Sequence, residues 1–534
     1  MNEFFTSASL VGTEIVVRGY NEEQKHFTRV NKNPTLKLYR VAEDKKEINT
    51  KFLSLKGEPL EEEEFNLTDY WRYAKKDDSY HGMKDPVLQE LSKRFKGEIH
   101  ANLTLINPLF FDIETEVTDT FPNAREAKHP ITCITVINGR NEATTWTTLQ
   151  IHKELLEEEE GDVIYCISEK KLLAKFIAYV REERPDFLVG YNSKEFDVPY
   201  IMKRILYLFP DNEERIEEKK KRSGKRYPTL RDKNTCFSQC LISPIYYNVD
   251  DKNKNKLIDF RRTYNDFDEE IDVYNIKGLP HLDYLELYKK YSNERLPNNK
   301  LDTVAEHELG DKKLAHPYSS LKEFYEKDPT NFVRYNIKDV RLLYKLNKRL
   351  MFIELATTVA HFGKISVEDV LATTQTWDGI LYNMALDEGI IVPPRIPKEF
   401  KESYMGAYVK EVIAGYHKNI VTFDFTSLYP MIIRMLGISP ETLVDSPRRS
   451  EEEIYKNIEQ FVNLIPNEDV MKAREENTTV AANGMRFKKN KQGLIPKAVA
   501  IVFNKRVNYK NEMKVHAKRA EAIKAELDRR NVSY

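Results

Sequence analysis

The chain has 534 residues, which is too many for one hydrophobic core and predicts three or four domains. The net charge is −1 with 32% charged residues, so no overall positive field is present, and any nucleic-acid surface must be local. Four cysteines exclude a disulfide framework, and Cys236 and Cys240 lack the second ligand pair that a zinc site needs, which favours thiols in a reducing compartment.

Residues 1–105 combine short strand-like runs with acidic turns. The runs Glu14–Arg18 and Thr35–Val41 are predicted strands, and the acidic run Glu61–Glu64 is predicted to be a solvated loop. We expect an N-terminal mixed α/β domain, in which no single residue stands out as a site.

Residues 106–351 alternate between strand and helix patterns. Strands are predicted at Ile131–Ile137, Val163–Ser168 and Asp186–Tyr191, with a helix over Lys171–Arg184. This alternation is typical of an α/β domain around a central sheet. A hairpin insertion is expected near 240–275, with two strand-like pieces around a Lys/Asn-rich turn in Tyr246–Phe260.

The rest of the chain is mainly helical. Helices are predicted from about Asp283 to Asp387, followed by a proline-marked joint at Ile390–Pro397 and a very polar helix from about Lys497 to Arg530. No apolar run approaches the roughly 18 residues that a membrane span needs, so we expect a soluble, intracellular protein without a membrane partner.

Four acids occur in three segments with apolar flanks. Asp112 and Glu114 lie two apart at a strand end and point to the same side. Asp197 follows the next strand, and Asp339 lies four residues after Tyr335, on one face of a helix. Hard oxygen ligands in this number suit two Mg²⁺ or Mn²⁺ ions, which can activate a water for phosphodiester hydrolysis, although each acid taken singly is more typical of a helix cap or a surface group.

In order, Asp-x-Glu, Asn-x-x-x-Phe-Asp and Tyr-x-x-x-Asp resemble the motifs of the DEDDy 3′→5′ exonucleases, over about 230 residues. The resemblance implies an RNase H-like domain in which Tyr335 orients the attacking water. It also implies that Phe121 and Asn192 contact a single-stranded DNA 3′ end. The implied metal ligands are Asp112, Glu114, Asp197 and Asp339.

The stretch NIVTFDFTSLYPMII, Asn419–Ile433, delivers one carboxylate, Asp424, to the end of an apolar run, as in half of a metal-dependent phosphoryl-transfer site. FDFTSLYPMIIR, together with MGAYVKE at Met405–Glu411 and the continuation GISPETL, resembles palm elements of the family-B DNA polymerases. AKHPI, LDYLELYKKY, TWDGILYN and ANGMRF are similar to the replicative polymerases of T-even-like tailed phages.

This second resemblance implies a nucleotidyl-transfer site with two Mg²⁺ or Mn²⁺ ions. Asp424 would hold both ions, with the carbonyl group of Phe425 as an extra ligand. The Tyr429 ring would lie beneath the sugar of the dNTP. The implied nucleotide-binding residues are Ser427, Leu428, Tyr429, Arg506 and Lys510. For the last two, a solvated helix face is the alternative, because that helix is rich in Lys and Arg.

A second palm aspartate, within an Asp-Thr-Asp turn, does not occur after Asp424. We therefore expect the N-terminal portion of a polymerase, either truncated or split between two polypeptides. The expected domains are 1–105 completed by helices 352–395, the exonuclease 106–351, a partial palm 396–480 and partial fingers 481–534. The expected partners are primer-template DNA, a C-terminal polypeptide and, through it, a sliding clamp, in a host cytoplasm if a phage encodes the chain.

Two alternative functions stay open at this point. One is a stand-alone exonuclease whose palm-like tail binds DNA or a partner, and the other is a non-catalytic replication scaffold. The palm stretch with Asp424, Tyr429 and Arg506 argues against the first, and the full set of four carboxylates argues against the second.

Overall fold

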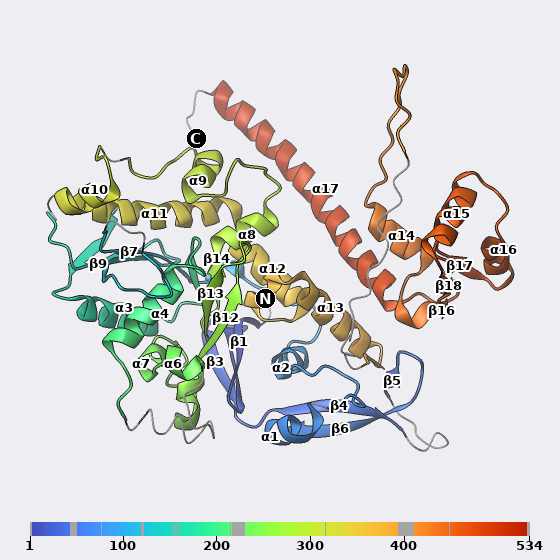
Figure 1. Cartoon of the computed structure of the whole chain (residues 1–534), viewed down its shortest axis with the longest axis horizontal. Coiled ribbons are helices and arrows are strands. Elements are labelled where there is room, and N and C mark those ends of the chain that lie inside the picture. Colours follow the sequence, from blue (N-terminus) through green and yellow to red (C-terminus); the bar gives the residue numbers. More distant parts are fainter. Residues whose placement is uncertain are drawn as a thin grey trace. The chain divides into compact units, whose positions relative to one another are not determined.

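The computed structural model describes residues 3–530 apart from 43–50, 76, 119–121, 153, 155, 157–159, 214, 216–229, 316, 394–410 and 448. The chain divides into two compact units (Figure 1). The first comprises Met1–Leu36, Glu64–Lys75 and Met83–Gly379, and the second comprises Lys37–Glu63, Lys76–Gly82 and Ile380–Tyr534. Among the described residues, no helix combines the length and apolar composition that crossing a membrane requires.

The first unit begins with an antiparallel sheet, in which β2 (Glu14–Tyr20) lies between β1 (Phe4–Val11) and β3 (His26–Asn31). Both faces of this sheet are covered. Phe5 packs with Leu91 of α2 (Pro86–Arg94), whereas Val16 belongs to the large core of the central sheet. The later helix α12 (Phe352–Gly363) also reaches β1, because His361 Nε2 lies 2.7 Å from the Phe5 carbonyl oxygen.

The central sheet of the first unit has six strands in the order β10-β9-β8-β7-β11-β14. Strands β7, β8 and β9 are antiparallel, and β11 and β14 continue the sheet parallel to β7. The predicted α/β class is confirmed, and this order agrees with an RNase H-like domain. The bounds are β7 (Pro108–Thr115), β8 (Ile131–Ile137), β9 (Ala143–Thr147), β10 (Asp162–Tyr165), β11 (Phe187–Gly190) and β14 (His281–Asp283).

Helices cover both faces of the central sheet (Figure 1). Alternate residues of β8 point to opposite faces. Cys133 packs against α11 (Pro329–Leu350), whereas Ile134 packs in the core with α3 (Glu169–Glu183) and α4 (Asp197–Leu208). Every residue of β8 is therefore buried, which explains its continuous apolar sequence. Further helices of this unit include α8 (Tyr284–Tyr291), α9 (Leu301–Leu309), α10 (Leu321–Lys327) and η6 (Val367–Leu371).

A hairpin is present in the expected range near 240–275, but its strands lie later than the predicted Tyr246–Phe260. Residues Asp251–Lys256 form a 3₁₀ helix, and the two strands are β12 (Ile258–Tyr264) and β13 (Glu270–Ile276). The prediction of strands on both sides of a turn in 246–260 was wrong because Asn253 is buried and its Nδ2 donates to Glu14 Oε2 at 2.9 Å. That long-range contact pins the polar segment to the N-terminal sheet.

The acidic run Glu61–Glu64 is not a loop. It lies in β6 (Leu60–Asn66), which pairs with β4 (Thr35–Val41). Glu62 accepts hydrogen bonds from Lys37 Nζ at 2.5 Å and from the Tyr39 hydroxyl at 3.2 Å. Cross-strand partners of this kind stabilise an acidic strand, which explains why the prediction was wrong.

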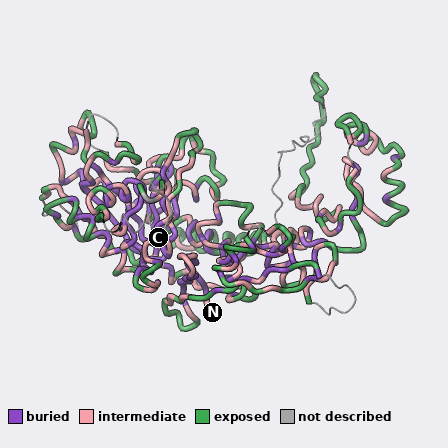
Figure 2. The backbone as a smooth tube through the Cα atoms, turned by 60° about the horizontal axis from the view of Figure 1, so that its bottom comes forward, coloured by how far each residue is buried: buried purple, intermediate pink, exposed green. Residues whose placement is uncertain are grey.

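In the C-terminal part of the second unit, fewer residues are buried than in the first unit (Figure 2). A short sheet, β16 (Leu443–Asp445), β18 (Arg486–Lys488) and β17 (Thr478–Val480), carries α15 (Glu451–Val462) and α16 (Glu468–Glu475) beside it. The predicted polar helix is confirmed as α17 (Leu494–Arg529). The second unit also contains β5 (Leu53–Ser54), β15 (Ile390–Ile391), α14 (Leu428–Leu436) and, from Ile380 onward, the end of α13 (Thr373–Asp387).

All four cysteines are buried, and none takes part in a disulfide, as predicted. Cys236 and Cys240 lie in and just before the short helix α7 (Phe237–Cys240). In the described part of the chain, no group of three or more His, Cys, Asp or Glu side chains is arranged to hold a metal ion. Cys236 and Cys240 belong to this described part.

Candidate functional site

Strand β7 presents Asp112 and Glu114 on one face of the central sheet. Phe111 and Ile113, which alternate with them, belong to the core on the other face. Phe110, on the same side as the two acids, packs against Tyr344 of α11 with ring centroids 5.6 Å apart. The two carboxylates therefore lie on the face that α11 covers.

Helix α4 begins at Asp197 and brings the third carboxylate to β7. Asp197 Oδ1 accepts a hydrogen bond at 3.2 Å from the backbone N–H of Ile113, the residue between Asp112 and Glu114. The loop before α4 is held by the buried Asp283 at the end of β14. Its carboxylate accepts from the backbone N–H groups of Asn192 at 2.9 Å and Lys194 at 3.0 Å.

Helix α11 supplies the fourth carboxylate, Asp339, together with two polar side chains. Tyr335 and Asp339 lie one turn apart on this helix, as predicted. Asn336 is fully buried, and its Nδ2 donates to Asp112 Oδ2 at 2.7 Å. Lys313 Nζ donates to Asp339 Oδ2 and lies 3.3 Å from the Tyr335 hydroxyl oxygen.

Burial raises the proton affinity of all four carboxylates. Burial and then repulsion from Asp197, Glu114 and Asp339 raise the pKa of Asp112 well above its ordinary value. Burial is also the main reason that the pKa of Glu114 rises to about 8 and that of Asp197 to about 7. Burial lowers the pKa of Lys313, but the charges of Asp339 and Tyr335 outweigh it and raise that pKa above the usual lysine value.

The donor set fits a divalent cation. All four members are carboxylates, the ligands that Mg²⁺ and Mn²⁺ prefer, and burial raises the pKa values of these carboxyl groups although the Lys313 ammonium group lowers them. Asp339 Oδ1 is buried and has no hydrogen-bond partner among the described residues. Lys313 donates a hydrogen bond to Asp339, and Asn336 donates one to Asp112. Among the described residues, the four carboxylates are not arranged around one common point as the ligands of a bound ion would be.

Three residues of this site were not predicted from the sequence. Lys313 stands in the lysine-rich run DKKLAHP and gives no periodic signal. Asn336 follows Tyr335 directly in the sequence. A position on the buried face of α11 was the one available sign that this asparagine belongs to the site. Asp283 caps the helix α8 after a short strand. An aspartate in this position indicates an N-cap, and the sequence does not show that it also holds the loop before α4.

The two predicted DNA-binding residues are placed differently. Phe121 lies outside the described residues. Asn192 has a positive φ of 59°, and its backbone N–H donates a hydrogen bond to Asp283 Oδ1. Its predicted contact with DNA stays a prediction.

The stretch around Asp424 differs from the carboxylate site in both backbone structure and exposure. Residues 411–427 have neither helical nor strand structure, and Ile420, Val421 and Phe423 are all largely exposed. Asp424 and Phe425 are exposed, Ser427 is the left-handed N-cap of α14, and Leu428 and Tyr429 begin this helix. Asp424 is therefore exposed to solvent, whereas Asp112 lies among other carboxylates in a partly buried site.

Helices α14 and α17 pack together in the second unit. Arg434 Cζ lies 5.7 Å from the ring centroid of Phe503, so the helix that carries Tyr429 lies against the helix that carries Arg506 and Lys510. Both basic residues are exposed, one turn apart. The nearby acids have other partners, since Asp445 pairs with Arg486 at 3.0 Å and Asp469 pairs with Arg449 at 2.7 Å.

Comparison with known proteins agrees with this division. Residues 82–240 match the exonuclease domain of DNA polymerase family B, and residues 366–534 match DNA polymerase family B. The chain belongs to the family B DNA polymerases. The match at 82–240 includes Asp112, Glu114 and Asp197, and the match at 366–534 includes Asp424 and Arg506.

The curated relatives come from several kinds of virus and from archaea. The chain is 28% identical to a DNA-directed DNA polymerase of Escherichia phage RB69, over 100% of this chain and 56% of the relative. It is 29% identical to the DNA-directed DNA polymerase of Enterobacteria phage T4, over 98% of this chain and 55% of the relative. A DNA polymerase of Thermococcus litoralis is 26% identical over 65% of this chain and 17% of the relative. The chain thus spans about half the length of the phage relatives it matches.

Proposed function

We propose that the chain is the N-terminal part of a DNA-directed DNA polymerase and that it removes nucleotides from single-stranded DNA 3′ ends. The observation that carries this proposal is the convergence of two half-buried carboxylates of β7 with two buried ones from α4 and α11, all with pKa values raised first by burial. Membership of the polymerase family supplies the substrate class.

Asp112, Glu114, Asp197 and Asp339 would hold two Mg²⁺ or Mn²⁺ ions. When bound, such ions activate water and stabilise the charge that develops on the phosphoryl group. In the reaction, the oxygen of a water forms a bond to the terminal phosphorus, and the bond from that phosphorus to the 3′ oxygen of the preceding nucleotide breaks. The products are a nucleotide 5′-monophosphate and a strand shortened by one residue.

The other side chains of the site orient the reactants. The Tyr335 hydroxyl is held by Lys313, and burial raises its pKa, so it stays protonated and can donate to the attacking water. Lys313 compensates part of the negative charge around Asp339. Asn336 and the backbone N–H of Ile113 fix the orientations of Asp112 and Asp197. Phe121 and Asn192 would contact the 3′-terminal nucleotide.

The second unit would contribute half of a nucleotidyl-transfer site. Asp424 and the Phe425 carbonyl would hold the ions, and the dNTP would contact Ser427, Leu428, Tyr429, Arg506 and Lys510. The packing of α14 on α17 supports this, because it brings the two predicted nucleotide-binding segments into one body. Synthesis would require a second carboxylate from another polypeptide, which could also connect the enzyme to a sliding clamp.

The domain boundaries belong to the same proposal. Residues 1–105 would form one domain with helices 352–395, supported by the contact between His361 and Phe5. The exonuclease would occupy 106–351, the partial palm 396–480 and the partial fingers 481–534.

The proposal is tested with the native chain, a single strand labelled at its 5′ end, and Mg²⁺. We expect a ladder of strands that shorten from the 3′ end and no reaction in EDTA. Glu116→Ala is the matched control, because Glu116 follows the same strand as Glu114 but is exposed, and it should degrade DNA at the native rate. Release of the 5′ label as the first product would contradict the proposed polarity.

A further inference from the structure

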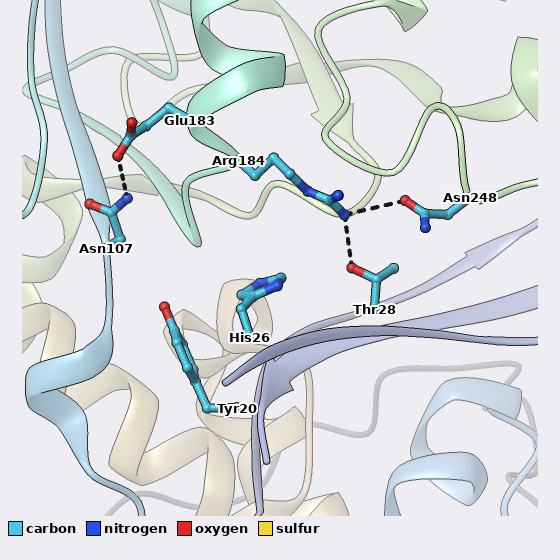
Figure 3. A pocket seen from close by; sticks show the side chains of 7 residues that line it. All are labelled: Tyr20, His26, Thr28, Asn107, Glu183, Arg184 and Asn248. Atoms are coloured by element: carbon cyan, nitrogen blue, oxygen red, sulfur yellow. Dashed lines mark hydrogen bonds between the residues drawn. The ribbon is translucent and has the colours of Figure 1, made fainter. Parts of the chain in front are cut away.

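A polar pocket lies between the N-terminal sheet and the C-terminal end of α3, far along the strand from the carboxylates. Its volume is about 420 Å³, within the range of small-ligand sites. Figure 3 shows the side chains that line it, with Tyr20 and His26 pointing into the same space from the N-terminal sheet. The lining residues are Tyr20, His26, Thr28, Asn107, Glu183, Arg184 and Asn248.

The charge in this pocket favours an anionic group near Arg184. Its guanidinium group donates to Thr28 Oγ1 at 3.0 Å and to Asn248 Oδ1 at 3.4 Å, as the dashed lines in Figure 3 mark. The one acid of the lining, Glu183, is bonded to Arg140 and Asn107 at 2.8 Å, so its charge is compensated. His26 Nε2 lies 3.3 Å from the Arg18 guanidinium and 3.7 Å from Asp186 Oδ1, so among the lining residues Arg184 is the group that offers a positive charge to the space.

An exposed aromatic residue stands directly before a lining residue of the pocket in the sequence. Tyr247 precedes the lining residue Asn248, is 72% exposed, and carries the Arg181 guanidinium 5.6 Å from its ring centroid. An aromatic face beside arginine side chains is the arrangement on which bases of single-stranded nucleic acids stack. The amides of Asn107 and Asn248 offer donors and acceptors to the edge of a base.

This pocket is separate from the carboxylate site. Asn107 precedes β7, and Glu114 is near its end, so roughly 23 Å of strand separate them at about 3.3 Å per residue. A strand end bound at the carboxylates does not fill this pocket with the same nucleotide.

We propose that the pocket and Tyr247 form a second binding site for single-stranded nucleic acid. One nucleotide enters the pocket, its phosphate lies on Arg184, and the base of a neighbour stacks on Tyr247. The choice of nucleic acid rests on the polymerase family to which the chain belongs, but the site needs neither metal nor a 3′ end, so it stands or falls separately from the proposed exonuclease.

The test measures binding of a circular, fluorescently labelled DNA single strand to the whole chain in EDTA, by fluorescence anisotropy. A circle has no 3′ end for the carboxylate site, and EDTA prevents hydrolysis. Tyr247→Leu should weaken binding at least about fivefold, the lower limit of base–aromatic stacking. Tyr207→Leu is the matched control, because Tyr207 is also 72% exposed and carries the guanidinium of Arg204 at 5.0 Å, but lies on α4.

Arg184→Asn tests the phosphate contact. Arg184 has a positive φ of 49°, which asparagine tolerates, so the backbone is retained. We expect the slope of log K against log salt concentration to lose about 0.7, the value for one phosphate contact to a single strand. Repeating the titration with a circular RNA of the same sequence shows which nucleic acid the site prefers, and tight binding of either supports it. Unchanged binding in both pocket variants, or an equal loss in Tyr207→Leu, would overturn the proposal.

Discussion

The ammonium group of Lys313 donates a hydrogen bond to Asp339 Oδ2 in the middle of the carboxylate site. It also lies 3.3 Å from the hydroxyl oxygen of Tyr335, one helical turn before Asp339. One lysine therefore links the acid expected to hold a metal ion with the hydroxyl expected to hold the attacking water. This arrangement leads to two predictions about catalysis.

Replacing Lys313 should slow hydrolysis and move its pH dependence. Lys313 lowers the pKa values of Asp112, Glu114, Asp197 and Asp339, so Lys313→Met raises them, and ionisation of the site requires a higher pH. We expect single-turnover rates about 10²-fold lower at pH 7, a typical effect of losing one electrostatic contact, with partial recovery at pH 9. Lys312→Met is the control, because Lys312 pairs with Glu306 at the surface. An unshifted pH profile would count against the assigned role.

Removing the hydroxyl group of Tyr335 should reduce the rate without disturbing the fold. In Tyr335→Phe the ring still packs near Phe324, 6.3 Å away, but the donor to the attacking water is lost. We expect a rate loss of about 10²-fold at saturating DNA and little change in KM. A large rise in KM with a native rate would instead assign Tyr335 to DNA binding.

His361 predicts an acid-sensitive contact between α12 and the N-terminal sheet. Burial lowers the pKa of His361 to about 4, below its ordinary value of 6.5. The unfolded chain therefore binds a proton that the folded chain does not, and stability falls as the pH decreases from 6.5 towards 4. Between pH 6.5 and 5 this costs about 2 kcal/mol of unfolding free energy.

His361→Gln removes this term. Urea unfolding of the native chain and the variant at both pH values gives the difference, which should be about 2 kcal/mol smaller for the variant. The comparison cancels the contributions of the carboxylates, which are present in both proteins. Equal pH dependence in the two proteins would show that His361 is not buried as a neutral ring.

The chain should not synthesise DNA by itself. With primer-template, Mg²⁺ and dNTPs, we expect no extension, because the exposed Asp424 lacks a second palm carboxylate. Adding a polypeptide that carries an Asp-Thr-Asp turn from a related phage polymerase should restore extension. The readout is a primer labelled at its 5′ end, and robust elongation by the chain alone would show that the site is already sufficient.

The elements that carry the four carboxylates were predictable because apolar residues flank them, and such segments become strands or helices of a core, whereas the role of these carboxylates as metal ligands stays a prediction from the resemblance. Lys313 was not predictable, because it lies in a lysine-rich loop whose partner, Asp339, is distant in sequence. The hairpin was misplaced for a similar reason, since Asn253 is fixed by Glu14 rather than by its neighbours. Local patterns do not contain contacts of this length.

The stretch around Asp424 shows the opposite case. Its apolar run has the composition of a buried strand, and yet Val421 and Phe423 are exposed and no strand forms at residues 411–427. A strand needs a neighbour to satisfy its backbone and cover its face, and composition alone does not supply one.

The central claim is that the four carboxylates catalyse 3′→5′ hydrolysis. The most direct measurement compares the native chain with Asp112→Ala/Glu114→Ala in single-turnover degradation of a single-stranded DNA labelled at its 5′ end, with Mg²⁺. We predict stepwise shortening from the 3′ end by the native chain, and a rate at least about 10³-fold lower in the double variant, as expected when the groups that hold catalytic ions are removed. Equal rates in the two proteins, or no degradation by the native chain, would contradict the claim.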